Sequence, residues 1–308
     1  MPGWKDYEIL YDLPEGEYAD PGAGGIRTRT IRSGSLLEVE CYPILRLSHE
    51  AEREKRRRRT GPAQAKLNRK RSARRCMRLI EANFTRRSLV LTLTYDYGLA
   101  RQRGLMNQGE LLREWERQGL PLDEGDARRD FQAFLRKVKR RMPEPEALRY
   151  LYVLETTCEP RDADPCPLPP HFHFHLVIDA PGLDRERLEA LWSHGFVESS
   201  RLRLGGGEAA RLARYLTKRE QKGGNGRRAR RWSCSRNLKD PEKAARVSDR
   251  KVSRRRAAMV AADVLRDGVQ ILERLYPGHR CEEPPEVRYS DFVPGAYIYA
   301  RMRRMRDV

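Results

Sequence analysis

The sequence predicts an α+β protein, with a central, mainly antiparallel sheet, helices packed on it, and basic N-terminal and C-terminal extensions. Strand-like and helix-like runs follow one another in the order strand, helix, strand, strand, helix. One of these strands carries three histidines at alternate positions. Charged residues make up 35% of the chain, above the usual ~25%, so much of the chain must face solvent or a ligand.

The chain begins with a loose arm and then turns strongly basic. Residues 1–25 are rich in Gly, Pro and acids, which predicts irregular structure, and residues 31–44 predict a short hairpin. Residues 65–83 combine cations with apolar residues at helical spacing, so we expect a basic amphipathic helix that contacts phosphates, unless the face is merely solvated. The cations expected to bind DNA in this part are Arg56, Arg57, Arg58, Arg59, Lys70 and Arg71.

A strand and a helix follow the basic segment. Residues 88–95 are rich in β-branched and aromatic residues, which predicts a strand with Thr92 and Thr94 on one face. Residues 126–141 fit an amphipathic helix that Asp126 can cap and that ends before Pro143. Its polar face is expected to bind DNA through Arg128, Arg136, Lys139 and Arg140.

Two further strands carry candidate metal ligands. Residues 150–155 predict a buried strand, and a proline-rich loop leads from it to the run His-Phe-His-Phe-His-Leu-Val-Ile at residues 171–178. Side chains alternate along a strand, so the histidines share one face and the phenylalanines the other. Each buried ring nitrogen needs a partner, so aligned imidazoles are hard to explain as core. The run predicts a divalent metal site, the alternative being a histidine-rich edge strand.

The helix expected at residues 208–219 carries a second chemical signal. Its apolar residues form a buried stripe, whereas Tyr215 lies off that stripe, toward Arg211 and Lys218. Cations favour the phenolate that a nucleophile needs, so Tyr215 is a candidate nucleophile. The alternative is an amphipathic surface tyrosine. Arg211 completes the predicted DNA-binding cations.

The overall charge favours a polyanionic partner. The chain has 63 Lys and Arg against 44 Asp and Glu, a formal net charge of +19. No apolar run reaches the ~18 residues of a membrane span, and the N-terminus lacks a signal-peptide pattern. We therefore expect a cytoplasmic protein with no membrane partner. The scattered cysteines predict free thiols, although Cys158 and Cys166 before the histidine strand leave a Cys/His zinc site open.

Three motifs, in this order, resemble those of HUH endonucleases, the rolling-circle replication initiators (Rep proteins) of plasmids, phages and single-stranded DNA viruses. They are Leu91-Thr92-Leu93-Thr94-Tyr95, His173-Phe174-His175 and Tyr215-Leu216-Thr217-Lys218. Residues 149–155 and 235–239 strengthen the resemblance, and residues 294–299 do so more weakly. The resemblance implies an HUH/Rep, RRM-like endonuclease domain at 65–239, an N-terminal arm and basic segment at 1–64, and a C-terminal helical extension at 240–308.

The resemblance also implies a mechanism. His173, His175 and Glu155 hold one Mg²⁺ or Mn²⁺, which polarises the scissile phosphate. Tyr215 attacks the phosphorus, forming a 5′-phosphotyrosyl link and freeing a 3′-hydroxyl that primes synthesis. Lys218 orients or deprotonates the phenol, or holds the phosphate.

Several alternatives stay open. His171 is a substitute ligand, although the run Leu-Val-Ile directly after the third histidine favours His173 and His175. The same chemistry would serve an HUH-type transposase or relaxase, and a catalytically silent DNA-binding regulatory protein is a further alternative. The expected partner is a single-stranded DNA origin near a hairpin. The chain has no P-loop motif, so a host helicase and polymerase are also expected.

Overall fold

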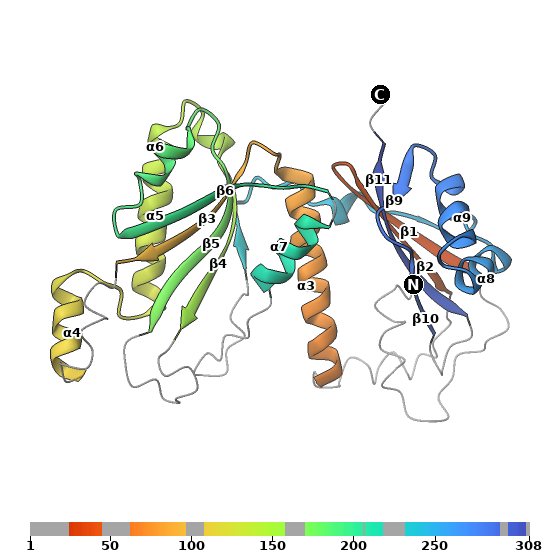
Figure 1. The fold of residues 1–308 in the computed structure, drawn as a ribbon, viewed down its shortest axis with the longest axis horizontal. Helices are drawn as coiled ribbons and strands as arrows, with labels where there is room; N and C mark the ends of the chain where they lie inside the picture. Colours follow the sequence, from red (N-terminus) through yellow and green to blue (C-terminus); the bar gives the residue numbers. More distant parts are fainter. Residues whose placement is uncertain are drawn as a thin grey trace. The chain divides into compact units, whose positions relative to one another are not determined.

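The computed structural model describes residues 25–44, 62–96, 108–157, 170–205, 207–217, 232–289 and 295–305. The chain divides into two compact units (Figure 1). The histidine unit comprises residues 83–204 and 208–238, and the second unit comprises residues 1–82, 205–207 and 239–308. Each unit contains an antiparallel sheet with helices packed on it, so the predicted α+β class is confirmed.

The unit boundaries differ from the predicted ones. The expected endonuclease domain began at residue 65, but residues 65–82 belong to the second unit. The segment expected as an N-terminal arm supplies strands to a sheet, and the C-terminal extension contains helices, as expected, but also supplies strands to that same sheet. Strand pairing between distant parts of the chain cannot be read from local periodicity, which is why the sequence did not predict this second sheet.

The histidine unit is built on a five-stranded sheet with the strand order β6-β3-β5-β4-β7. Each pairing between neighbouring strands is antiparallel. Its elements are β3 (Leu89–Tyr95), α4 (Gln108–Arg117), α5 (Glu124–Arg141), a 3-10 turn (Pro145–Ala147), β4 (Arg149–Thr157), β5 (His171–Asp179), α6 (Arg185–Glu189), β6 (Gly195–Arg201), α7 (Glu208–Thr217) and β7 (Ser233–Cys234).

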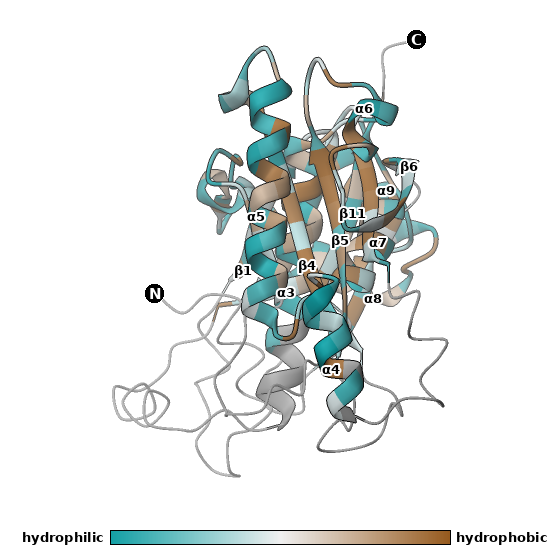
Figure 2. Ribbon diagram, turned by 90° about the vertical axis from the view of Figure 1, so that its left-hand side faces the viewer, coloured by the Kyte–Doolittle hydropathy of each residue, from teal (hydrophilic) through white to brown (hydrophobic). Residues whose placement is uncertain are grey.

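Helix α5 packs on one face of this sheet. Its apolar stripe is buried, and the ring of Phe131 stacks on that of Phe174 with centroids 4.6 Å apart. Figure 2 shows the strands largely in the hydrophobic colour and α5 largely in the hydrophilic one, as expected for a solvent-facing amphipathic helix. The predicted cap is wrong by three positions: Asp123 is the N-cap, and its carboxylate accepts from the backbone N–H of Asp126 at 2.9 Å.

The predicted alternation along the histidine strand is confirmed. Phe172 and Phe174 are fully buried in the core beneath α5, whereas the histidines are half-buried on the opposite face. Helix α7 lies against β4 and buries Ala209, Ala213 and Leu216. We call the sheet face that carries the histidines the histidine face.

The second unit has its own antiparallel sheet, in which β10-β11-β2-β1-β8 are neighbours and β9 also pairs with β11. The predicted hairpin is present, and its turn uses Gly34 at φ +60°, where a Cβ would lie 2.4 Å from the Glu81 carbonyl oxygen. The elements are β1 (Ile26–Ser33), β2 (Leu36–Pro43), α3 (Pro62–Asn83), a 3-10 turn (Pro241–Ala244), β8 (Arg246–Ser248), α8 (Arg254–Ala262), α9 (Asp267–Leu275), β9 (His279–Cys281), β10 (Glu286–Tyr289) and β11 (Ala296–Arg304).

The basic helix α3 forms as expected, but part of its charge is used inside the second unit. The buried guanidinium of Arg78 donates to Glu38 at 2.5 Å and to Glu242 at 2.7 Å. The guanidinium of Arg74 lies 3.9 Å from the ring centroid of Tyr299. Acids that are distant in the sequence balance these cations, so for this part of α3 the phosphate-contact interpretation is replaced by a packing role.

Two smaller expectations concern membranes and thiols. None of the helices in the described ranges combines the length and apolar character needed to cross a membrane. Cys41, Cys76, Cys234 and Cys281 are not joined in disulfides, as expected. The two cysteines of the open zinc-site alternative, 158 and 166, lie outside the described residues.

Candidate active site

Strand register brings the predicted metal ligands together on the histidine face. Glu155 of β4 stands directly opposite His173 of β5. On the other side of β5, Thr94 stands opposite His173 and Thr92 opposite His175. Side chains directly opposite in an antiparallel pair lie ~4.5–5.5 Å apart at Cβ, so this register makes one polar row across three strands.

His175 and Glu155 are in direct contact. The Nε2 atom of His175 lies 2.8 Å from the Oε2 atom of Glu155, and the two side chains are 13% and 18% exposed. Since the carboxylate accepts hydrogen bonds, the imidazole donates in this arrangement. The expectation that Glu155 points toward the histidines is met for His175.

Threonine hydroxyls hold the other ring nitrogens. The Oγ1 atom of Thr92 lies 3.2 Å from Nδ1 of His175, and the Oγ1 atom of Thr94 lies 3.3 Å from Nδ1 of His173. A partner at Nδ1 fixes the ring orientation and leaves Nε2 facing the row. The sequence analysis placed both threonines on one face but gave them no role; the signal was their spacing of two, which matches that of the histidines.

Burial favours the neutral form of both imidazoles. Desolvation lowers the pKa of His173, and neighbouring His175 lowers it further. Desolvation also lowers the pKa of His175, against the opposing effect of the Glu198 carboxylate. A neutral imidazole has a free lone pair, so these histidines can act as metal ligands at neutral pH.

The donor set suits a divalent cation, although its members are not arranged as a closed cage. Two neutral imidazoles and a carboxylate are ligand types that transition metals and Mn²⁺ accept. Within the described part of the chain, no group of three His, Cys, Asp or Glu side chains is close enough to count as a preformed metal site. The residues fit a metal by chemistry and register, and His173 must approach the pair formed by His175 and Glu155.

His171, the substitute ligand, has a different environment. It stands opposite Thr157 at the start of β5, and its ring stacks on that of Trp115 from α4, with centroids 5.7 Å apart and planes at 30°. The structure therefore associates His171 with an aromatic neighbour, whereas His173 and His175 have threonine partners.

The candidate nucleophile reaches this site from α7. Tyr215 is 56% exposed, and its hydroxyl lies 3.4 Å from Nε2 of His175. The two rings meet edge to face, with centroids 5.2 Å apart at 81°. Of the two predicted cationic neighbours, Arg211 is ion-paired with Glu208 at 2.8 Å, and Lys218 lies outside the described residues.

The predicted DNA-binding cations fall in several places. Those on α5 lie on the helix that covers the face opposite the histidines; Arg128 pairs there with Glu124 at 3.2 Å. The others on this helix are exposed: Arg136, Lys139 and Arg140. In α3 of the second unit, Lys70 lies 3.9 Å from Glu286, and Arg71 is half-buried. Four predicted contacts lie outside the described residues: Arg56, Arg57, Arg58 and Arg59.

The flanking segments that strengthened the resemblance have structural roles. Ser235 exchanges hydrogen bonds with the backbone of Tyr150, and Asn237 Nδ2 donates to the carbonyls of Glu146 and Leu148 at 2.9 and 3.0 Å. These contacts anchor the start of β4, which carries Glu155 at its other end. Residues 296–299 of the 294–299 segment belong to β11, in the second unit.

Part of the chain matches a known protein family. Residues 88–222 match the family model of the replication-associated protein ORF2/G2P. The matched range contains β3, β4, β5 and the described part of the tyrosine helix α7. It supports a role in replication initiation. Neither the curated proteins nor the solved structures include a match to this chain.

Proposed function

We propose that the histidine unit nicks and rejoins single-stranded DNA by a metal-assisted transesterification, with Tyr215 as nucleophile, and that this reaction initiates rolling-circle replication. One observation carries the proposal: the Tyr215 hydroxyl lies 3.4 Å from a histidine ring nitrogen that also contacts a carboxylate at 2.8 Å. Three separate elements, α7, β5 and β4, supply these groups, and all three lie within the residues that match the replication-associated protein family.

The protein's part in metal binding follows from the hydrogen bonds. His173, His175 and Glu155 would hold one Mg²⁺ or Mn²⁺, which when bound polarises a phosphate and stabilises its developing charge. To act as a ligand, His175 must present the Nε2 lone pair, so on metal binding its ring proton would move from Nε2, where it is donated to Glu155, to Nδ1, where the Thr92 hydroxyl would accept it. Two nitrogen ligands favour Mn²⁺ over Mg²⁺, because Mg²⁺ prefers oxygen.

The proposed chemical step needs an accessible phenol. The Tyr215 oxygen attacks the phosphorus, the new O–P bond forms, and the bond from phosphorus to the 3′-oxygen breaks. The 3′-oxygen takes a proton and leaves as a hydroxyl, and the reverse step rejoins the strand. The exposure of Tyr215 gives a polyanion access to its hydroxyl. Lys218, three residues later on the chain, is the group that we propose holds the phosphate or takes the phenol proton.

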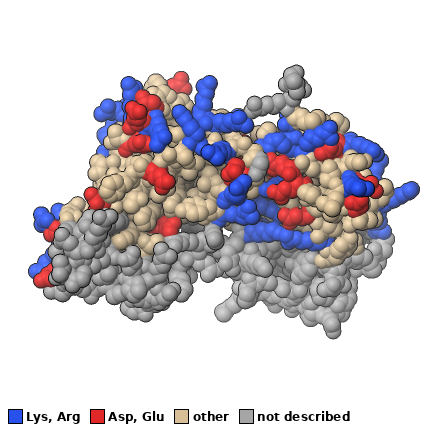
Figure 3. Space-filling model, viewed as in Figure 1, with Lys and Arg blue, Asp and Glu red and all other residues tan. Residues whose placement is uncertain are grey.

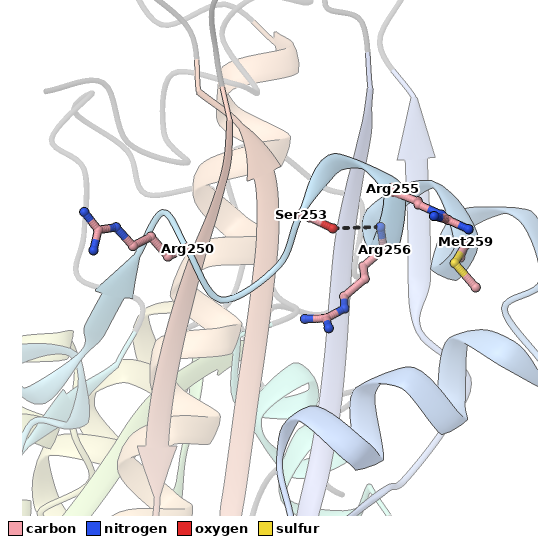
Figure 4. Close-up of a pocket in the computed structure, with 5 residues that line it drawn as sticks. All are labelled: Arg250, Ser253, Arg255, Arg256 and Met259. Atoms are coloured by element: carbon pink, nitrogen blue, oxygen red, sulfur yellow. Dashed lines mark hydrogen bonds between the residues drawn. The ribbon is translucent and has the colours of Figure 1, made fainter.

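The charge of the protein suits the proposed DNA partner. The chain carries a formal net charge of +19, and Figure 3 shows Lys and Arg spread over the visible face of each unit, with acids among them. In the second unit, Arg250, Arg255 and Arg256 line a hollow beside the start of α8, which Ser253 caps (Figure 4). The proposed partners are a single-stranded origin near a hairpin and, after nicking, a host helicase and polymerase.

A covalent-capture experiment tests the function without knowledge of the origin. The full-length protein is incubated with Mn²⁺ and a labelled pool of random single-stranded DNA, and the protein is denatured before gel analysis. We expect a labelled band at the mass of a DNA–protein adduct, absent with Tyr215→Phe. The matched control is Tyr289→Phe, since that tyrosine is 64% exposed. Binding of the pool without any adduct would instead identify a catalytically silent DNA-binding protein.

A further inference from the structure

We propose that Phe196, on the edge strand β6, is a stacking platform for a nucleobase of the bound single strand. The inference rests on the proposed function, because it takes single-stranded DNA as the ligand. It adds a residue that contacts the base beside the cleaved phosphate, whereas the groups above act on the phosphate itself.

The exposure of Phe196 is unusual for this unit. Its side chain is 64% exposed. Among the described residues of the histidine unit, the other exposed large apolar side chains are Tyr215, at 56%, and Leu112, at 36%. A single exposed apolar residue does not by itself indicate a binding site, so the inference depends on where Phe196 lies on the sheet.

Strand register places Phe196 in the row of the candidate active site. Phe196 stands opposite Thr94, and Thr94 stands opposite His173, which in turn stands opposite Glu155. Directly opposite side chains share a sheet face, so all four lie on the histidine face. Neighbouring strands are ~4.8 Å apart, which puts Phe196 two strand spacings, or ~10 Å, from His173. The next residue, Val197, packs on the opposite face against the core.

The surroundings of Phe196 favour a base over a phosphate. Two residues further along the same face, Glu198 is exposed and stands opposite Thr92. Its carboxylate repels phosphate oxygens, so the backbone of a bound strand is kept from this edge while its bases can approach. An aromatic ring offers every base a stacking surface whatever the sequence. A strand whose phosphate lies at His175 would therefore place a neighbouring base over Phe196.

Binding of a short oligothymidylate with one 2-aminopurine tests the inference, using the full-length Tyr215→Phe protein so that no cleavage occurs. Phe196→Ala should weaken binding by roughly 5- to 30-fold. This is the lower part of the affinity loss expected when an aromatic residue that stacks on one base is replaced by alanine. Phe196→Leu, which keeps an apolar side chain but no ring, should also weaken it, and Phe196→Trp should retain it. 2-Aminopurine quenching should be strongest at one position and be lost in Phe196→Ala.

The matched control is Tyr289→Ala, since this aromatic side chain on β10 of the second unit is also 64% exposed. Equal binding by Phe196→Ala and its parent, or full binding by Phe196→Leu, would overturn the stacking role. These outcomes do not depend on whether the protein cleaves DNA. Cleavage is tested separately, by the adduct assay on the protein that retains Tyr215. If the wild-type protein binds the strand but forms no adduct, the cleavage proposal fails while the stacking test still stands. No binding at all would overturn both.

Discussion

Replacing Thr92 with valine tests whether the threonine hydroxyls orient the histidines as metal ligands. Valine keeps the branched shape and the strand preference of threonine but removes the group 3.2 Å from Nδ1 of His175. The ring then loses the partner that fixes its orientation. We expect the folded protein to persist, because Thr92 is only half-buried and its backbone pairing is unchanged.

The expected loss can be estimated from the single contact removed. A hydrogen bond of this kind contributes ~0.5–1.5 kcal/mol, and the loss of an outer partner of a metal-bound histidine typically lowers metal affinity by ~10–100-fold. We therefore expect Mn²⁺ to bind Thr92→Val about tenfold more weakly than the wild type. Thr94→Val should have a similar effect on Mn²⁺ affinity, because the Oγ1 atom of Thr94 lies 3.3 Å from Nδ1 of His173.

Calorimetric titration with Mn²⁺ measures this change directly. The matched control is Thr30→Val, which also removes a strand threonine hydroxyl, one that donates to the Arg246 carbonyl at 3.5 Å in the second unit. The Mn²⁺ affinity of Thr30→Val should equal that of the wild type, whereas its melting temperature should change about as much as that of Thr92→Val. If Thr92→Val and Thr94→Val bind Mn²⁺ as the wild type does, the threonines do not orient metal ligands and the reasoning fails.

Three further predictions concern catalysis, DNA contact and folding. Lys218→Ala should slow adduct formation by ~10²–10⁴-fold, as for a lost acid–base group; an unchanged single-turnover rate would exclude that role. Replacing the exposed α5 cations Arg136, Lys139 and Arg140 with alanine should leave the salt slope for a short strand unchanged, since α5 covers the opposite sheet face, whereas each lost phosphate contact would lower the slope by ~0.7. Phe131→Ala should lower the free energy of unfolding by ~3–5 kcal/mol, because it empties a fully buried site; a loss under ~1 kcal/mol in denaturant titration would contradict the core assignment.

Local periodicity was enough to predict much of the candidate site. Alternation along β5 separated His173 and His175 from Phe172 and Phe174, and both sets lie where expected. The helical spacing around Tyr215 likewise predicted an exposed tyrosine beside a buried stripe. These predictions succeed because a side chain's direction within one element follows from its position alone.

Contacts between distant parts of the chain could not be predicted in this way. The threonine partners of the histidines depend on the register between β3 and β5, which no single segment encodes. The basic helix α3 contains a single acid, Glu81, among its many cations, so its charge pointed to phosphate. Glu38 and Glu242, distant in sequence, nevertheless bind Arg78. A cationic run therefore predicts a polyanion contact only where folding leaves its charges unpaired.

The measurement that tests the central claim most directly is mass spectrometry of the wild-type protein after reaction with single-stranded DNA and Mn²⁺. Protease and nuclease digestion should leave a 5′-phosphonucleotide on the peptide that contains Tyr215. Two other tyrosines near the sheet are less accessible: Tyr95 is 1% exposed and donates to Asp130 at 3.0 Å, and Tyr152 is 7% exposed. A nucleotide found on Tyr95, Tyr97 or Tyr152, with none on Tyr215, would contradict the account.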